Sequence, residues 1–289
     1  KLRVDAAAEM AADSDLAEVA LDVLVRADQH YWLHQTTWFG EPVLQLPQDL
    51  LALQEIIFNT RPRFVIEVGA AWGGSLLFYS TLMDALGGER VIAIDIYIPE
   101  DLKERIGSFG KVSDRITWVN GSSIEQSTID QIKAIVGDSR ETLVVLDSNH
   151  AHDHVLQELR LYSSLVGEGY YLVCADTIVE AIPEQKHRPR PWGPGNNPRT
   201  ALDQFIIDPD GSIRSQFQEV APTAADDRAV LATHHGLIRW QDDLASFRIP
   251  TEEYLFDIVA EFDRRILHGA IDIGDRQWHE RAPWCRDRL

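Results

Sequence analysis

The chain has 289 residues, of which 46 are acidic and 27 basic, so its formal net charge is −19. A protein with this negative charge repels the phosphate backbone of nucleic acids, so we do not expect a nucleic acid as its partner. With 45% hydrophobic and 25% charged residues the composition is that of a folded domain, and no apolar run approaches the roughly 18 residues of a membrane span.

The cysteines and the first residues bear on the compartment. Cys174 stands in an apolar run and Cys285 in a polar tail, a pattern without a disulfide framework that favours a reducing environment. Residues 1–16 lack the apolar core of a signal peptide. We therefore expect a cytoplasmic protein that is not secreted and does not span a membrane.

The N-terminal part of the chain has helical periodicity. Residues 6–29 carry apolar side chains at helical spacing and predict an amphipathic helix. A second helix is predicted over residues 47–59, with Pro47 in its first turn. Between the two, residues 31–39 are rich in large aromatic rings. We expect residues 1–60 to form a helical cap.

The middle of the chain alternates short apolar runs with helical stretches. The runs predict strands buried on both faces at residues 64–68, 91–95, 116–119, 143–147 and 170–176. Strands of this kind, alternating with helices, indicate an α/β fold with a mostly parallel, doubly wound sheet. We assign residues 61–240 to this core and 241–289 to a C-terminal extension, with a helix over 252–267.

A Pro/Gly-rich loop at residues 183–198 interrupts the core. A long loop inside a compact fold is more often a lid or a binding loop than a spacer. Its Trp192, like the aromatic residues 31–39, could line an acceptor pocket or equally serve as a hydrophobic anchor. After the loop we expect a helix over 199–207 and strands near 215–220 and 229–233.

Acidic residues gather at the ends of the four long strands. Asp95, Asp147 and Asp176 each end a strand, and Glu67 stands near the end of the first. In open α/β sheets ligands bind outside the carboxyl ends of the strands. The acids therefore predict a site that binds hydroxyls, amines or a metal.

The first strand runs into a glycine turn, residues 67–75 (EVGAAWGGS). Glycines there let the backbone approach a ligand and expose N–H groups. The dinucleotide fingerprint is G-x-G-x-x-G, whereas this spacing is G-x-x-x-G-G, which disfavours a nicotinamide-dependent oxidoreductase. The E-x-G-x-x-x-G form is similar to the S-adenosylmethionine-binding turn of class I methyltransferases, in which an acid after the next strand, here Asp95, holds the ribose hydroxyls. The blander alternative is that the glycines only pack the helix against the strand.

The strand predicted at residues 143–147 ends in Asp147 and is followed by Ser148-Asn149-His150, and the next ends in Ala175-Asp176, followed by Thr177. Two carboxylates on adjacent strand ends can share a hard cation such as Mg²⁺. This layout resembles metal-dependent, catechol-type O-methyltransferases, which carry a general base at the place of His150. An imidazole that titrates near neutral pH suits proton removal. The alternatives are that His150, His152 and His154 open a solvated helix, or that His150 and His154 bind zinc, for which no motif speaks.

Four segments together resemble the cephalosporin hydroxylase / rhamnosyl O-methyltransferase family over residues 30–240. They are residues 36–40 (TTWFG), 67–75 (EVGAAWGGS), 145–150 (VLDSNH) and 190–198 (RPWGPGNNP). The resemblance implies the Rossmann-like class I methyltransferase fold, S-adenosylmethionine as cofactor and Mg²⁺. It also implies a hydroxyl-bearing sugar or natural product as acceptor, and assembly into homo-oligomers.

The same resemblance implies a role for each candidate residue. It assigns the cofactor to Glu67, Gly69, Gly73, Ser75, Asp95, Ser122 and Asp147. It assigns proton removal to His150 and the metal to Asp147 and Asp176. Some members carry two adjacent acids after the fifth strand, where this chain has Ala175-Asp176. Thr177 is then the third expected ligand, where catechol-type enzymes carry an asparagine, and water would complete the site.

We therefore predict an S-adenosylmethionine-dependent, Mg²⁺-assisted O-methyltransferase acting on a hydroxyl of a small molecule, such as a deoxysugar on a natural product. Iron- and 2-oxoglutarate-dependent hydroxylation is disfavoured, because it is commonly signalled by H-x-D and no histidine here is followed two residues later by Asp or Glu. The alternative of another class is a non-catalytic relative that serves as an assembly or partner-binding subunit. The joint presence of the glycine turn, Asp95, Asp147 and His150 argues against it.

Overall fold

The computed structural model describes residues 9–10, 12–207, 217–220 and 236–240. These belong to the first of two units of the chain, Lys1–Asp242, and the second, Asp243–Leu289, lies outside them. The expected strand at 229–233 and the C-terminal helix also fall outside the described residues, and the domain boundaries stay predictions. No described helix combines the length and apolarity needed to cross a membrane.

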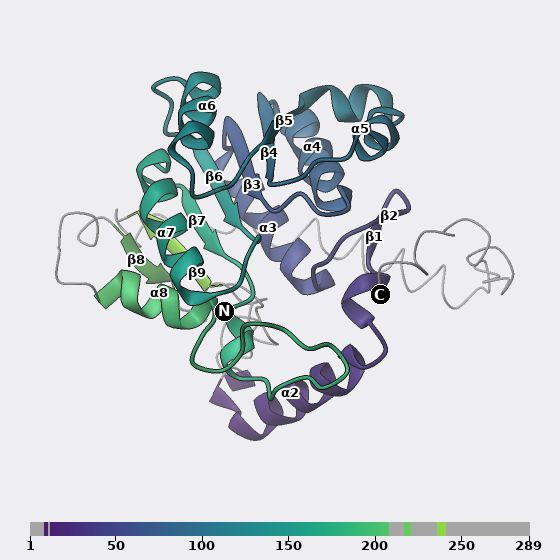
Figure 1. Ribbon diagram of the computed structural model, residues 1–289, viewed down its shortest axis with the longest axis vertical. Coiled ribbons are helices and arrows are strands. Elements are labelled where there is room, and N and C mark those ends of the chain that lie inside the picture. Colours follow the sequence, from purple (N-terminus) through teal and green to yellow (C-terminus); the bar gives the residue numbers. More distant parts are fainter. Residues whose placement is uncertain (1–8, 11, 208–216, 221–235, 241–289) are drawn as a thin grey trace, which may run out of the picture. The chain divides into compact units, whose positions relative to one another are not determined.

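A seven-stranded sheet forms the centre of the described residues (Figure 1), with the strand order β5-β4-β3-β6-β7-β9-β8. The strands from β5 to β7 run parallel, and β9 pairs antiparallel with both β7 and β8. This confirms the predicted mostly parallel sheet. The strands are β3 (Phe64–Val68), β4 (Arg90–Asp95), β5 (Ile116–Asn120), β6 (Thr142–Leu146), β7 (Tyr171–Cys174), β8 (Phe217–Val220) and β9 (Gly236–Trp240).

Helices cover both faces of the sheet, because alternate side chains of each strand point to opposite faces. Ile66 of β3 belongs to a core cluster with α6, α7 and α8, whereas its neighbour Val65 belongs to a cluster with α3 and α4. The longer helices are α3 (Pro47–Thr60), α4 (Gly74–Leu86), α5 (Glu100–Gly107), α6 (Gln126–Val136), α7 (His152–Tyr162) and α8 (Pro198–Ile207). Short 3-10 turns are η2 (Gly110–Arg115), η3 (Ser163–Leu165) and η4 (Thr177–Glu180).

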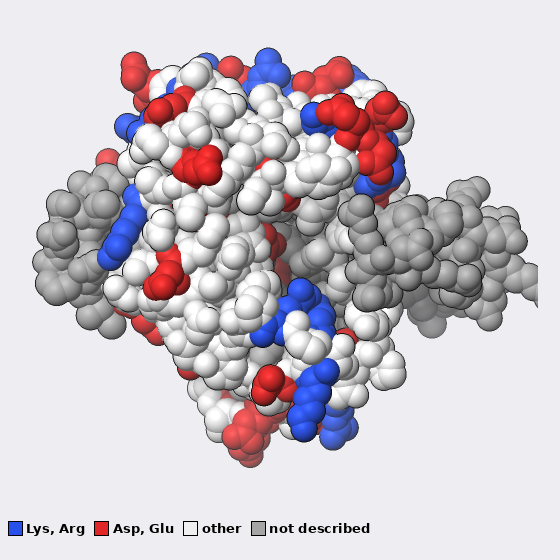
Figure 2. Space-filling model, in the orientation of Figure 1, with Lys and Arg blue, Asp and Glu red and all other residues white. Residues whose placement is uncertain are grey.

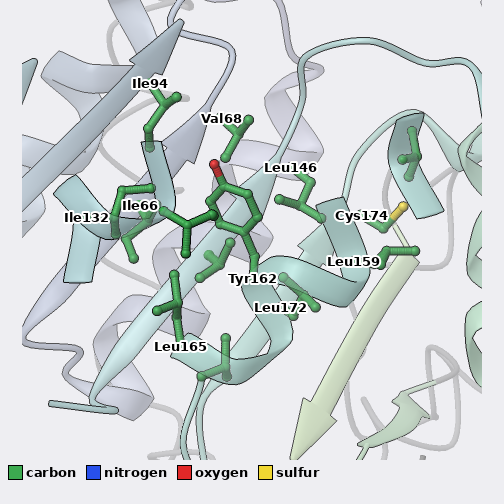
Figure 3. Packing of buried hydrophobic residues seen from close by; sticks show 14 of the residues in the cluster. Ile66, Val68, Ile94, Ile132, Leu146, Leu159, Tyr162, Leu165, Leu172 and Cys174 are labelled. Atoms are coloured by element: carbon green, nitrogen blue, oxygen red, sulfur yellow. The ribbon is translucent and has the colours of Figure 1, made fainter. Parts of the chain in front are cut away.

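Tyr162, the last residue of α7, lies at the centre of the first cluster. Figure 3 shows its ring surrounded by Ile66, Val68, Leu146 and Leu172 from three neighbouring strands. Tyr162 and its strand neighbours are almost completely buried, and burial of such side chains contributes about 25 cal/mol per Å² of apolar surface removed from water. The packing of Tyr162 therefore fixes the position of α7, the helix that follows the Asp147–His150 segment.

The N-terminal cap is tied to the core through its aromatic segment. Before α3, the predicted cap of residues 1–60 contains α2 (Ser14–Asp28), η1 (Trp32–Gln35) and a two-stranded hairpin of β1 (Thr37–Trp38) and β2 (Glu41–Pro42). Trp38 packs edge-on against Phe78 of α4, with ring centroids 5.2 Å apart, and its Nε1 donates to Thr81 Oγ1 over 3.2 Å. For Trp38 the structure therefore supports the interpretation as a hydrophobic anchor.

The sheet reverses its winding direction between β3 and β6. From β3 the chain proceeds to β4 and β5 on one side, and from β6 to β7 on the other. A crevice outside the carboxyl ends of the strands forms at such a switch point. Gly69, just after β3, and Asp147, just after β6, meet here, and the Asp147 N–H donates to the Val68 carbonyl over 2.8 Å.

Gly69 is required by this close approach. Its φ is +103°, and a Cβ at this position would lie 2.1 Å from the carbonyl oxygen of Asp147. Gly87, which ends α4, also has a positive φ, +80°, but a Cβ there would meet no atom within 4 Å. The two glycines share a left-handed backbone, and only Gly69 faces a steric clash.

We expect Gly69→Ala to lower the free energy of unfolding by clearly more than Gly87→Ala. The control substitution carries only the conformational strain of a left-handed residue, about 1–2 kcal/mol, whereas Gly69→Ala must also push β3 and β6 apart. Denaturant unfolding of both variants measures the difference. Equal losses would show that the strand ends can separate without penalty.

Candidate functional site

The glycine turn between β3 and α4 places a buried carboxyl beside a serine. Glu67, the fourth residue of β3, is 1% exposed, and Ser75 Oγ donates to its Oε2 over 3.0 Å. Burial raises the pKa of Glu67 well above its ordinary value, the hydrogen bond from Ser75 opposes this, and the charges of Asp147 and Asp95 raise it further. A cationic group nearby would lower that pKa again.

Asp95 ends β4 and faces the same turn. Its Oδ2 accepts from the Ala71 N–H over 3.3 Å and its Oδ1 from the Tyr97 N–H over 3.2 Å. Two backbone N–H groups therefore hold the carboxylate in place. Because a carboxylate can accept about four hydrogen bonds, both oxygens keep the capacity to accept from a ligand hydroxyl.

Three further side chains meet at the ends of β6 and β7. Asp147, His150 and Asp176 each offer one ligand atom, and these atoms all lie within 4.8 Å of one another. His150 Nε2 is in close contact with Asp176 Oδ2 and lies 3.8 Å from Asp147 Oδ1. Asp176 has a left-handed backbone, with φ +56°. No group of metal-ligating residues in the described part of the chain joins His150 with His154.

The surroundings of His150 favour its charged form. Its Nδ1 lies 3.1 Å from the Ser148 carbonyl oxygen and its Nε2 contacts the Asp176 carboxylate, so both ring nitrogens face acceptors. Burial by itself lowers the pKa of His150, but the charge of Asp176 with its hydrogen bond, and then the charge of Asp147, outweigh this and raise the pKa to about 9.

Trp192 forms a wall over His150. The two rings are stacked, with centroids 5.0 Å apart and an angle of 26° between their planes. The loop around Trp192 is held by Asn197, whose Nδ2 donates to the Gly193 carbonyl over 2.8 Å, and by Glu180, which accepts from the Gly195 N–H over 2.8 Å. The Pro/Gly-rich segment is therefore fixed at the site by hydrogen bonds within itself and to Glu180 of η4.

A second contact joins this loop to the N-terminal cap. Asp28, at the end of α2, is 4% exposed and accepts from Arg188 Nη2 over 2.7 Å, and His187 Nε2 lies 2.9 Å from its other oxygen. Because a buried carboxylate is stable only when it is paired, this contact is expected to hold the loop against α2.

Two adjoining cavities are lined by these residues. The first cavity, of about 300 Å³, is lined by Glu67, Ser75, His150 and Asp176, with Arg188 and Arg190 also at its wall. The second, of about 340 Å³, is lined by Asp95, Ser122, Ser123 and His154. Gly69, Ala71, Asp147, Ser148 and Trp192 line both. Figure 2 shows a hollow near the middle of this face, with acidic atoms inside it and a basic group beside it.

A family model described as Rhamnosyl O-methyltransferase/CmcI matches residues 29–221. The chain belongs to this family. Its sheet and covering helices accordingly form the Rossmann-like class I methyltransferase fold that was predicted.

Curated relatives carry the name rhamnosyl O-methyltransferase. The one from Mycobacterium tuberculosis is 26% identical over 167 residues, which cover 55% of this chain and 66% of the relative. The one from Mycobacterium leprae is 28% identical over 167 residues, covering 55% and 70%. The chain thus spans slightly less than two thirds of the length of the first of these relatives.

Solved structures that are similar to this chain include the following two. One is the CmcI-N160 apo structure, with a TM-score of 0.48 and 20% sequence identity. The matched region covers 73% of this chain and 78% of the CmcI chain. The MycE methyltransferase from the mycinamycin biosynthetic pathway, in complex with Mg, SAH and mycinamycin VI, has a TM-score of 0.46 at 16% identity and covers 70% and 51%.

Nearly all residues that the sequence proposed for the site line one of the two cavities. They are Glu67, Gly69, Gly73, Ser75, Asp95, Ser122, Asp147, His150 and Asp176. Thr177 begins η4 directly after Asp176 but is not among the lining residues of either cavity. The roles of all these residues stay predictions.

The sequence did not single out Ser123 or Glu158, and it considered His154 only as part of a solvated helix start or of a zinc site with His150. Ser123 follows Ser122 directly, so the strand end could have indicated it. Glu158 lies in α7 at a position that a helical pattern assigns to an ordinary polar residue, and no signal marks it.

Without metal, we expect the stability of the protein to fall as the pH rises from about 6.5 to about 9. The pKa of His150 is raised from 6.5 to about 9 in the folded chain, so its stabilising contribution is complete below the lower value and is lost through the higher one. In chelator, the midpoint of thermal unfolding should therefore decline as the pH rises through this range. The decline should be smaller in His150→Gln.

His152→Gln is the matched control for this measurement. The ring of His152 contacts the Thr200 and Gln204 side chains, so its replacement removes an imidazole from the same segment without breaking the contact between His150 and Asp176. An equal slope in wild type and His150→Gln would contradict the assignment of a charged His150.

Proposed function

We propose that the chain is an S-adenosylmethionine-dependent, divalent-metal-assisted O-methyltransferase that acts on a hydroxyl of a small molecule. The observation that carries the proposal is the meeting of Asp147, His150 and Asp176 at the junction of two cavities. The acceptor class we propose is a deoxysugar or a related natural-product hydroxyl, in keeping with the name of the rhamnosyl relatives.

The ligand atoms of the site suit a hard cation. Asp147 and Asp176 supply carboxylate oxygens, which Mg²⁺ prefers, and Mg²⁺ commonly keeps several waters when few protein ligands are present. When bound, the cation would supply Lewis acidity toward an acceptor hydroxyl, and S-adenosylmethionine would supply an electrophilic methyl group. The residues of this chain then have to hold both partners and move one proton.

His150 is the candidate for the proton transfer. The carboxylates that keep its ring protonated, Asp176 and Asp147, are the same groups that would hold the cation. Cation binding and protonation of His150 therefore oppose each other. With those carboxylates engaged elsewhere, Nε2 becomes free to accept a proton from an acceptor hydroxyl, and the ring stays oriented by Trp192 and the Ser148 carbonyl.

Two other carboxyl groups suit the cofactor. Asp95 is fixed by two backbone N–H groups and keeps lone pairs for the hydroxyls of a ribose. Glu67 is buried with a raised pKa, and an ammonium group nearby would favour its ionised form. Cytoplasmic location and homo-oligomeric assembly are further parts of the proposal and await direct measurement.

Calorimetric titration with S-adenosylhomocysteine tests the cofactor assignment. Wild type should bind, and Asp95→Asn should bind about 10- to 100-fold more weakly, since a hydrogen bond to a charged group contributes about 1.5–3 kcal/mol. Absence of binding by the wild type at high ligand concentration would refute the assignment. Binding of NADH in its place, seen in ultraviolet difference spectra, would favour an oxidoreductase.

Asp147→Ala should abolish methyl transfer from labelled S-adenosylmethionine to a deoxysugar acceptor, and should abolish calorimetric binding of Mg²⁺, while the variant stays folded. The reason is that the substitution removes one of two carboxylates at the proposed cation site. Asp153→Ala is the control, because Asp153 is an exposed acid in the first turn of α7. Full activity of Asp147→Ala in chelator would dismiss a metal role.

A further inference from the structure

Glu158, in the middle of α7, is a carboxyl group with no exposure to solvent. Its Oε1 accepts from Ser123 Oγ over 2.5 Å and from Ser148 Oγ over 2.6 Å, and lies 3.1 Å from His154 Nε2. Its Oε2 is buried and has no hydrogen-bond partner among the described residues. Burying a carboxylate is unfavourable unless its contacts offset the loss of water, so a position of this kind calls for a reason beyond packing.

The partners of Glu158 come from two different strand ends. Ser123 belongs to the loop after β5, directly after Ser122, and Ser148 to the loop after β6, directly after Asp147. Both serines line the second cavity, and Ser148 lines the first one as well, whereas Glu158 lines neither. One buried oxygen thus connects the wall of the second cavity with the segment that carries the candidate metal ligands.

The connection continues to His150. The carbonyl oxygen of Ser148 faces His150 Nδ1 at 3.1 Å, so a shift of Ser148 would turn the imidazole as well. Both serine hydroxyls donate to Glu158 Oε1, so their protons point inward. Ser123 Oγ also lies 3.0 Å from His154 Nε2, whereas the remaining lone pairs of Ser148 Oγ can accept from N–H or O–H groups of a ligand in the cavity.

We propose that Glu158 is a positioning residue that holds the Ser123 and Ser148 loops together, so that the cofactor cavity and the candidate metal site keep one geometry. It acts only through its partners. The inference rests on the proposed function, because it assigns the two cavities to a cofactor and a metal-bound acceptor. Removing the carboxylate of Glu158 should release both loops at once. Replacing a residue that lines only one cavity should affect that cavity alone.

The variant Glu158→Gln tests this, with Thr142→Val as the matched control. Thr142 is likewise completely buried and donates to the Leu165 carbonyl over 2.6 Å, at the opposite end of β6 and away from both cavities. Calorimetry should show Glu158→Gln binding S-adenosylhomocysteine at least about tenfold more weakly than wild type, the effect typical of outer supporting groups, with Mg²⁺ weakened in the same direction. Thr142→Val should lower the thermal midpoint and leave both affinities unchanged.

The two serines give a second, milder test should Glu158→Gln fail to fold. If Glu158 couples the loops, Ser123→Ala and Ser148→Ala should be non-additive in their effect on S-adenosylhomocysteine affinity, because either one already breaks the bridge. Unchanged affinities in Glu158→Gln, or strict additivity of the two serine variants, would overturn the inference. A wild-type chain that binds no S-adenosylhomocysteine would instead refute the proposed function, and the inference would fall with it.

Discussion

Four acidic side chains meet at one edge of the parallel sheet, and the structure has to keep these like charges together. Glu67, Asp95, Asp147 and Asp176 lie at the ends of neighbouring strands. Burial raises the pKa of Glu67, and the charges of Asp147 and Asp95 raise it further. Each is stabilised differently: by Ser75, by backbone N–H groups, or by the His150 ring. A site of this kind gains most from a ligand or cation that brings positive charge.

The close approach of these strand ends also determines the backbone geometry of the glycine turn after β3. Only glycine at position 69 lets the end of β3 pass against the Asp147 carbonyl, so the turn and the candidate metal ligand lie next to each other at the switch point of the sheet. A bulkier turn would separate the two cavities that now share Gly69 and Asp147. The fold itself therefore brings the glycine turn close to Asp147, and the side chains only adjust the distance between them.

The sequence predicts the strand-end acids well, for a physical reason. Residues that end buried parallel strands must emerge at one edge, so Asp95, Asp147 and Asp176 could be brought together without coordinates. Contacts between distant segments have no such local pattern. The pairing of Asp28 with Arg188 spans 160 residues, and Glu158 has the spacing of an ordinary polar helix residue. The strand β9 was missed at Gly236–Trp240, because its antiparallel pairing with β7 departs from the alternation that identified the others.

The Pro/Gly-rich loop shows how such distant contacts change an interpretation. Its composition predicted either a lid or a binding loop. These two roles differ in how much the loop becomes ordered when a ligand binds. In the structure Asn197 and Glu180 close the loop on itself, Asp28 ties it to α2, and Trp192 already stacks on His150. A wall fixed in this way loses little conformational freedom when an acceptor binds. The loop is therefore better described as a preformed wall of the two cavities that Trp192 lines than as a lid that closes over them.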